Sequence, residues 1–150
     1  YGNYLVNAGG AVEFPINVSY TYTESSFQTS FNSSFSQWGN VKQGDALPYL
    51  PKNIGRIQVG AEAAQWEAFA AVNYQDKMRD QAGRGSFDGI IHTDDYATLD
   101  LSFLWRPSKA WLVQLTVDNV TEEEAIVSWR PFGARPNSPR LYRGRVRYTF

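Results

Sequence analysis

Strict alternation of apolar and polar residues marks six segments of this 150-residue chain. Successive side chains of a β-strand point to opposite faces, so a period of two predicts a strand with one apolar and one polar face. A shorter strand is expected at 1–7, ahead of a Gly9–Gly10 pair. The six longer strands are predicted at 14–26, 54–64, 66–76, 95–106, 110–119 and 140–150.

The connections between these segments are either very short or long. The short ones are the pair at 64–65 and the Pro-Ser-Lys turn at 107–109. The long ones, at 27–53, 77–94 and 119–140, are rich in Gly, Ser, Asn, Pro and charged residues. This rhythm predicts an antiparallel up-and-down meander with its tight turns at one end, its long loops at the other, and almost no helix.

The alternation also assigns each strand residue to a face. Phe69 and Leu104 break the pattern, because each is a large apolar residue on a polar face. If the sheet closes as a barrel, the apolar residues should point away from the axis; examples are Val18, Val59, Val72, Leu101, Leu115 and Val146. The polar residues should point inward, and they include Gln58, Asn73, Ser102, Thr116 and Arg145.

The aromatic residues indicate that the apolar face meets lipid. Trp66, Trp105 and Trp111 lie on that face beside the short turns. Four tyrosines lie on the same face at the opposite strand ends: Tyr20, Tyr22, Tyr74 and Tyr142. Two rows of amphipathic rings are typical of the girdles of an outer-membrane barrel. We therefore predict a membrane girdle formed by Trp66, Trp105, Trp111 and the C-terminal Phe150.

Strand length supports the same choice. The predicted strands are close to the roughly 9–11 residues that a tilted strand needs to cross lipid, whereas strands of globular proteins average about 5–6. The fold class is therefore predicted to be all-β, an antiparallel transmembrane barrel. A soluble β-sheet binding module and a small passive outer-membrane barrel remain the alternatives.

Composition and charge exclude several other functions. There are 14 Lys and Arg against 15 Asp and Glu, so no charge excess favours nucleic acid as a partner. The chain has no cysteine, which excludes a disulfide scaffold and a thiolate metal site. No nucleophile and base stand in a recognisable motif, so we expect neither catalytic residues nor an enzyme.

Four motifs resemble TonB-dependent outer-membrane receptors. Leu-Pro-Tyr-Leu-Pro at 47–51 is similar to the family's Leu-Pro-Tyr-x-Pro segment, and Val-Asp-Asn-Val at 117–120 is similar to its Val-x-Asn-Leu motif. The segment 130–140 resembles its Pro-Gly-x-Pro-Arg segment, and 144–150 resembles its Gly-x-x-Tyr-x-Phe ending, with one more residue between the glycine and the tyrosine. The Thr-Glu-Glu that follows Val120 departs from the family's usual loop start. Within the family, the sequence is most similar to the ferric dicitrate receptors.

The resemblance implies a larger molecule than this chain. Receptors of this family have a 22-stranded barrel around an N-terminal plug, and six or seven strands cannot close around a plug. Residues 1–150 are therefore expected to be a C-terminal segment of the barrel, without the plug. Its expected partners are lipid, the rest of the barrel and plug, TonB through the missing N-terminal part, and the barrel-assembly machinery through Phe150.

The resemblance also implies uptake of ferric chelates across the outer membrane of a Gram-negative cell. Iron would be only a chelated substrate, so no cofactor and no metal site are expected in this segment. Ligands would meet the extracellular loops, where guanidinium groups could pair with carboxylates of an iron complex. The candidate ligand-binding residues are Arg79, Arg84, Arg130 and Arg135.

Three other polar groups are expected to have ordinary roles. His92, followed by Thr-Asp-Asp, has no second ligand cluster, and Glu122–Glu123–Glu124 reads as a solvated loop. Arg143, Arg145 and Arg147 share the polar face of the last strand, where they are expected to line the lumen and face acidic residues of the plug.

Overall fold

The computed structural model describes residues 1–7, 10–36 and 38–150, without the side chain of Asn7. Gly9 of the predicted glycine pair lies outside these residues. Within them, seven strands form one antiparallel sheet in the order β1-β2-β5-β6-β7-β8-β11. These strands are β1 (Gly2–Asn7), β2 (Val12–Tyr22), β5 (Asn53–Ala63), β6 (Trp66–Gln75), β7 (Tyr96–Ser108), β8 (Trp111–Asp118) and β11 (Leu141–Tyr148).

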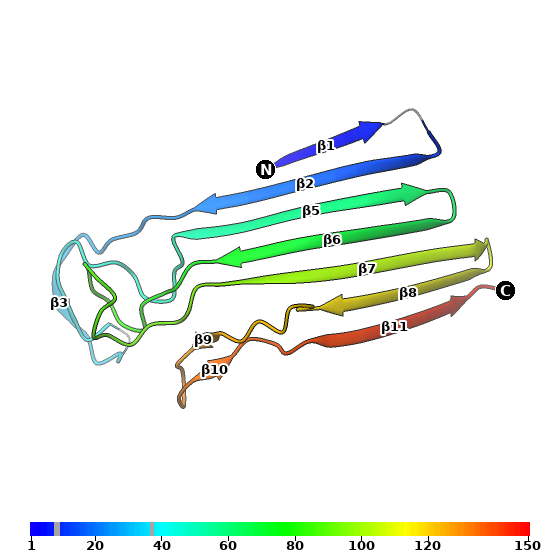
Figure 1. Ribbon diagram of the computed structural model, residues 1–150. Helices are drawn as coiled ribbons and strands as arrows, with labels where there is room; N and C mark the ends of the chain where they lie inside the picture. The colour runs from blue at the N-terminus through cyan, green and yellow to red at the C-terminus, as the bar shows by residue number, and fades with distance from the viewer. Residues whose placement is uncertain (8–9, 37) are drawn as a thin grey trace.

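Two small hairpins lie in the long connections. β3 (Phe31–Asn32) pairs with β4 (Asn40–Val41), and β9 (Ile126–Ser128) pairs with β10 (Arg135–Pro136). Figure 1 shows the meander, with the long connections gathered at one end of the sheet and the tight turns at the other. No part of the described chain forms a helix that could cross a membrane.

All seven predicted strands are therefore confirmed, but the first long one ends earlier than predicted. We expected it to run from 14 to 26, whereas β2 begins at Val12 and ends at Tyr22. Tyr22 pairs with Asn53, the first residue of β5, and Thr23 makes a last backbone hydrogen bond to Lys52. The neighbouring Pro51 has no N–H group to continue the ladder. Residues 24–26 consequently have no strand to pair with.

The second tight turn is also shifted. We expected it at 107–109, but β7 continues to Ser108, and the turn is formed by Lys109 and Ala110. The register between β7 and β8 shifts between Trp105 and Ser108. A bulge of this kind accommodates Pro107 near a strand end, because a bulged residue need not donate to the ladder.

The register groups the side chains by face as predicted. Val59 of β5 pairs with Ala70, which pairs with Leu101, which pairs with Val117. Polar residues are aligned in the same way, and Arg56, opposite Asn73, donates to its side-chain oxygen. Every residue that we assigned to the apolar or the polar face is paired across the sheet with residues of the same face.

No second layer covers the apolar face in the part of the chain that the structure describes (Figure 1). Leu115 is 53% exposed and Val146 is 64% exposed. The buried apolar side chains are Ala71 on the sheet and Val41, Met78 and Ala125 in the connections. Among the described residues, the sheet alone therefore has no packed core, and most of the buried apolar side chains lie in the loops.

Candidate ligand-binding loops

The three long connections, at 23–52, 76–95 and 119–140, pack against one another at one end of the sheet. A β-bridge joins Ala46 to Gly83 across the first two of them. The second and third are joined by Asp94, whose backbone N–H donates to Ile126 O and whose carboxylate accepts from Ile126 N–H at 2.7 Å. The loops thus form a continuous surface rather than three separate excursions.

One carboxylate in these connections, that of Asp80, is buried and bonded to both of the other connections. Asp80 is 4% exposed, and it accepts hydrogen bonds from Arg130 Nε at 3.0 Å and Nη2 at 2.7 Å. The Tyr49 hydroxyl donates to the same carboxylate at 2.6 Å. The Arg130 guanidinium, helped by the Tyr49 hydroxyl and opposed by burial, holds the pKa of Asp80 below its ordinary value.

Trp129 extends this network. Its backbone N–H donates to the Tyr49 hydroxyl at 3.1 Å, and its indole Nε1 donates to the carbonyl of His92 at 2.6 Å. We call Asp80, Arg130, Tyr49 and Trp129 the loop junction. Each of the three connections contributes at least one of its members.

Three members of the junction, Tyr49, Asp80 and Trp129, are not among the ligand-binding residues predicted from the sequence. Two of the five tryptophans, Trp38 and Trp129, lie in the connections rather than in the predicted girdle. That position was a signal that the loops have a packed interior of their own. Trp38 confirms this, because its ring makes edge contacts with the rings of Phe27, Phe31 and Phe35.

Two of the four candidate arginines have internal partners. Arg130 binds Asp80 and also donates to Ser36 Oγ at 2.6 Å. Arg79 is 8% exposed, donates to the carbonyls of Gly85 and Ser86, and lies 4.7 Å from the centre of the Phe87 ring. The Arg130 guanidinium joins different connections, whereas the Arg79 guanidinium stabilises the connection at 76–95 in which it lies.

The other two candidates, Arg84 and Arg135, face solvent. The Arg84 side chain is 65% exposed and lies 3.9 Å from the nearest oxygen of Asp45. Arg135 is exposed, and its Nη1 makes a long contact of 3.5 Å with the Arg130 carbonyl. Asp45 itself is 6% exposed, but both contacts are too long for strong hydrogen bonds, so both exposed guanidinium groups can reach an anionic molecule.

The remaining polar candidates have local partners. His92 Nδ1 lies 2.8 Å from the carbonyl oxygen of Thr93, and its ring makes an edge contact with Phe87. In the described residues no three His, Asp or Glu side chains come together as metal ligands. Glu122 pairs with Arg140 at 2.5 Å, whereas Glu124 is exposed.

Asn119, from the Val-Asp-Asn-Val motif, organises the base of the third connection. It is 3% exposed and adopts a left-handed backbone conformation with a φ of 50°. Its side-chain nitrogen donates to the carbonyls of Glu123 and Ser138, and its side-chain oxygen accepts from Glu123 N–H at 2.9 Å. Asn tolerates this backbone region better than most residues do, which explains why the motif places it there.

The predicted girdle residues lie at the tight-turn end of the apolar face. Trp66 pairs across the strands with Trp105, and Trp111 pairs with Tyr148. The Trp111 and Tyr148 ring centres are 4.8 Å apart, and the Phe150 ring lies 5.0 Å from that of Tyr148. The aromatic residues therefore gather at the same end of neighbouring strands, as the pair Trp66 and Trp105 and the group Trp111, Tyr148 and Phe150.

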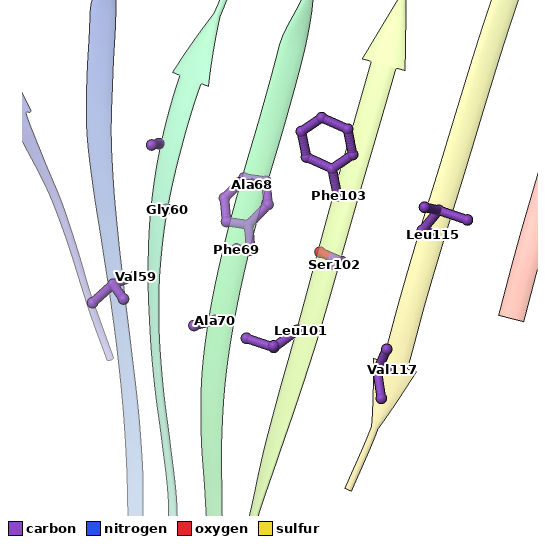
Figure 2. A pocket seen from close by; sticks show the side chains of 11 residues that line it. Val59, Gly60, Ala68, Phe69, Ala70, Leu101, Ser102, Phe103, Leu115 and Val117 are labelled. Carbon is purple, nitrogen blue, oxygen red and sulfur yellow. The ribbon is translucent and has the colours of Figure 1, made fainter. Parts of the chain in front are cut away.

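A shallow groove crosses the middle of the apolar face. Figure 2 shows that it forms where Ala68 and Ala70 lie between Val59 on one side and Leu101 and Phe103 on the other. The small side chains on β6 leave the hollow, and its lining is almost wholly apolar. It is part of the apolar face and has no grouping of polar side chains that would bind a charged ligand.

These features define the class of the protein: an up-and-down sheet with an aromatic-edged apolar face, a polar face and long loops at one end is a wall of a membrane-type β-barrel. The family model for the TonB-dependent receptor-like β-barrel matches residues 4–120. The chain therefore belongs to the TonB-dependent receptor-like β-barrel family. No curated protein matches the sequence.

Solved receptor structures share this fold. The siderophore receptor PiuA from Acinetobacter baumannii superposes with a TM-score of 0.70 at 17% identity, over 97% of this chain and 20% of its own. A mutant of the ferric enterobactin receptor PfeA from Pseudomonas aeruginosa superposes with a TM-score of 0.62 at 14% identity, over 99% of this chain and 21% of its own. The chain thus spans about a fifth of the length of these receptors, and the likeness shows the fold.

Proposed function

We propose that this chain is part of the barrel wall of an outer-membrane receptor that takes up ferric chelates with energy supplied through TonB. The observation that carries the proposal is the family match over 4–120, combined with a barrel-wall fold. The names of PiuA and PfeA, a siderophore receptor and a ferric enterobactin receptor, favour chelated iron as the substrate. Iron enters this proposal as cargo, with transport rather than catalysis as the activity.

The proposal places residues 1–150 in the C-terminal part of the barrel, with the plug outside this chain. β1 and β11 are the edges of the sheet, and an open strand edge is not tolerated in lipid. Further strands on both sides would remove these edges. TonB would act on the part of the receptor outside this chain, and the barrel-assembly machinery would bind the strand that ends at Phe150.

Charges on the polar face support a filled lumen. Glu13 lies directly opposite Glu62, which lies opposite Glu67, and like charges in such pairs are destabilising. Arg106 pairs with Glu67 at 2.6 Å, but no ion pair compensates Glu13 or Glu62 within the described residues. Arg145 and Arg147 form no ion pair within the described residues, whereas Arg143 pairs with Asp118 at 2.6 Å. A plug with charges of the opposite sign would compensate both groups.

We propose Arg84 and Arg135 as the main ligand contacts among the four candidate arginines. Both are exposed, and a hydrogen bond from a guanidinium to an anionic oxygen is stronger than one between neutral groups. Arg79 and Arg130 would contribute mainly by supporting the loops. Because the family covers several chelates, this assignment concerns an anionic ferric complex in general and not the dicitrate complex in particular.

Binding and uptake of radioactive iron by the full receptor test this proposal. Ferric citrate and ferric enterobactin would be offered to cells that carry the receptor, with and without TonB. We expect Arg84→Gln and Arg135→Gln each to weaken binding of the accepted chelate by roughly tenfold, as expected for the loss of one charge-assisted hydrogen bond. Lys109→Gln, in a tight turn at the opposite end, is the matched control.

Uptake that does not depend on TonB would contradict the receptor assignment. Unchanged affinity in the double variant Arg84→Gln with Arg135→Gln would instead contradict only the assignment of the contacts. The two parts of the proposal can therefore fail separately.

A further inference from the structure

We infer that Asp80 is a positioning residue that joins the three long connections into one body, and that Arg130 serves this junction rather than a ligand. Asp80 belongs to 76–95, Arg130 to 119–140 and Tyr49 to 23–52. One carboxylate therefore makes direct contacts with both of the other connections. The inference concerns the loops themselves and holds whether or not the receptor takes up iron.

The burial of Asp80 argues against an exchange of Arg130 between Asp80 and a ligand. Asp80 is 4% exposed, so water cannot replace the two hydrogen bonds that Arg130 donates. Removing Arg130 from Asp80 is unfavourable, because the carboxylate would stay buried with only the Tyr49 hydroxyl to compensate its charge. An anion that drew Arg130 away would have to overcome this cost. Arg135 forms no ion pair within the described residues, and Arg84 lies 3.9 Å from the buried Asp45, which keeps a hydrogen bond from Lys42 N–H when Arg84 moves.

Tyr49, a member of the junction, has an unusual backbone conformation. Tyr49 has a φ of 54°, a left-handed conformation that is unfavourable for a residue with a large side chain. In this conformation its hydroxyl donates to Asp80 and accepts from Trp129 N–H. The local strain at Tyr49 is thus offset by contacts with both of the other connections.

Trp129 closes the network. Its indole donates to the carbonyl of His92, in the same connection as Asp80, while the neighbouring Arg130 binds Asp80 itself. The β9–β10 hairpin is therefore attached to 76–95 at two adjacent residues. A displacement of any one connection would break contacts in the other two.

The coupling of the three connections has a consequence for ligand binding. Arg84 lies in 76–95 and Arg135 lies in 119–140, on segments that the junction holds together. The backbone positions that carry them are consequently held at a fixed separation instead of being brought together by a moving loop. This part of the argument rests on the proposed function, whereas the coupling of the loops does not.

Hydrogen exchange measured by mass spectrometry on the full receptor in detergent micelles tests the coupling. One hydrogen-bonded amide reports on each connection: Ala46, Thr93 and Trp129. In Asp80→Asn we expect peptides that contain these amides to exchange at least about tenfold faster in all three connections, with exchange of β5 and β6 unchanged. Glu124→Gln, which removes an exposed charge from the third connection, should leave all three unchanged.

A second and milder variant protects the test against misfolding. Tyr49→Phe removes one hydroxyl and should produce a smaller acceleration in the same three connections. Asp80→Asn combined with Arg130→Gln should exchange only slightly faster than Asp80→Asn alone, since both changes remove the same ion pair and the double variant loses in addition only the hydrogen bond from Arg130 to Ser36. Faster exchange confined to the connection that carries the substitution would overturn the inference, and so would additive effects in the double variant.

Discussion

At the scale of single residues, the loops depend on an acid that remains ionised. Asp80 has a lowered pKa because Arg130 and Tyr49 donate to it more strongly than burial disfavours its charge. The unfolded chain binds a proton at the ordinary carboxylate pKa, whereas the folded chain binds it only at lower pH. Asp80 therefore contributes a stability that is complete above the ordinary value and is lost as the pH falls through the lowered one.

We consequently expect the loop junction to stay intact from pH 7 down to about pH 5 and to loosen only below about pH 4. The measurement is the exchange of the amide of Trp129 as a function of pH, corrected for the intrinsic pH dependence of exchange. Asp80→Asn, which has no carboxylate at this position, should lack the acid transition. Loosening between pH 7 and pH 5 would mean that another group controls the junction.

A second residue-scale feature is the pair Gly60 and Phe69. Phe69 breaks the sequence alternation, and the structure explains it: the ring lies on the polar face against Gly60 of the neighbouring strand. A Cβ atom at Gly60 would lie 2.5 Å from two carbons of that ring. An aromatic ring that covers a glycine in this way compensates for the missing side chain.

Gly60→Ala should therefore destabilise the folded barrel by about 1–3 kcal/mol, the usual range for overpacking. Unfolding in denaturant, followed by heat-modifiable gel mobility, measures the change. Gly55→Ala is the matched control in the same strand, because a Cβ there meets no atom within 4 Å. With Phe69→Ala in the background, most of the cost of Gly60→Ala should disappear, and the small remainder would come from Pro15, whose Cγ lies 3.1 Å from the same position. An undiminished cost would show that Phe69 is not its origin.

At the scale of the strands, most of what could be predicted follows from the alternation of apolar and polar residues. The period of two identifies the strands and their faces because a half-covered strand repeats the same environment at every second residue. Boundaries were less accurate, since the end of β2 depends on where β5 begins, and the turn after β7 depends on a bulge. Both depend on a partner strand that local sequence does not specify.

The apolar face gives a prediction at this scale. Leu101 lies on that face near the middle of β7, and Ser102 is its neighbour on the polar face. Leu101→Arg should cost about 2–4 kcal/mol if Leu101 meets the bilayer midplane, as on the lipid face of other barrels. Ser102→Arg should cost much less, because its side chain faces the lumen. Equal costs for the two substitutions, measured by reversible unfolding in lipid vesicles, would remove the distinction between the faces.

The loop junction shows the limit of prediction for the candidate site. Four arginines could be selected by type and position, but whether each one is free depends on contacts between segments far apart in the sequence. Arg130 and Asp80 are separated by 50 residues, and Tyr49 and Trp129 by 80. No local pattern encodes these pairs, so the structure was needed to divide the arginines into two with partners inside the loops and two facing solvent.

At the scale of the whole molecule, the sheet lacks a core of its own. Side chains such as Ile57, Val72 and Leu115 are about half exposed in the chain, so their burial must come from outside it. Lipid on one face and a plug on the other would supply the missing contacts. The order of events then matters, because this apolar surface is exposed until the barrel has assembled.

Deletion of Phe150 can distinguish an effect on assembly of the barrel from an effect on its stability. Phe150 is exposed in the folded sheet, and the ring contact recorded for it is an edge contact with Tyr148 at 5.0 Å. Contacts between aromatic rings contribute about 0.5–1.5 kcal/mol, so the folded barrel should lose little when Phe150 is deleted. If the terminal ring is the signal read by the assembly machinery, the loss should appear earlier, as fewer receptors in the outer membrane.

We therefore expect deletion of Phe150 to lower outer-membrane abundance several-fold while the extracted barrel keeps nearly normal resistance to heat. Both quantities come from one experiment, in which the membrane fraction is quantified and its heat-modifiable gel mobility is followed with temperature. Tyr142→Ala provides the control, since Tyr142 is an exposed aromatic residue of the same strand at its opposite end. That variant should assemble normally. Normal abundance after deletion of Phe150 would show that the terminal ring is not a sorting signal, and an equal loss in Tyr142→Ala would show that any exposed ring of β11 has the same effect.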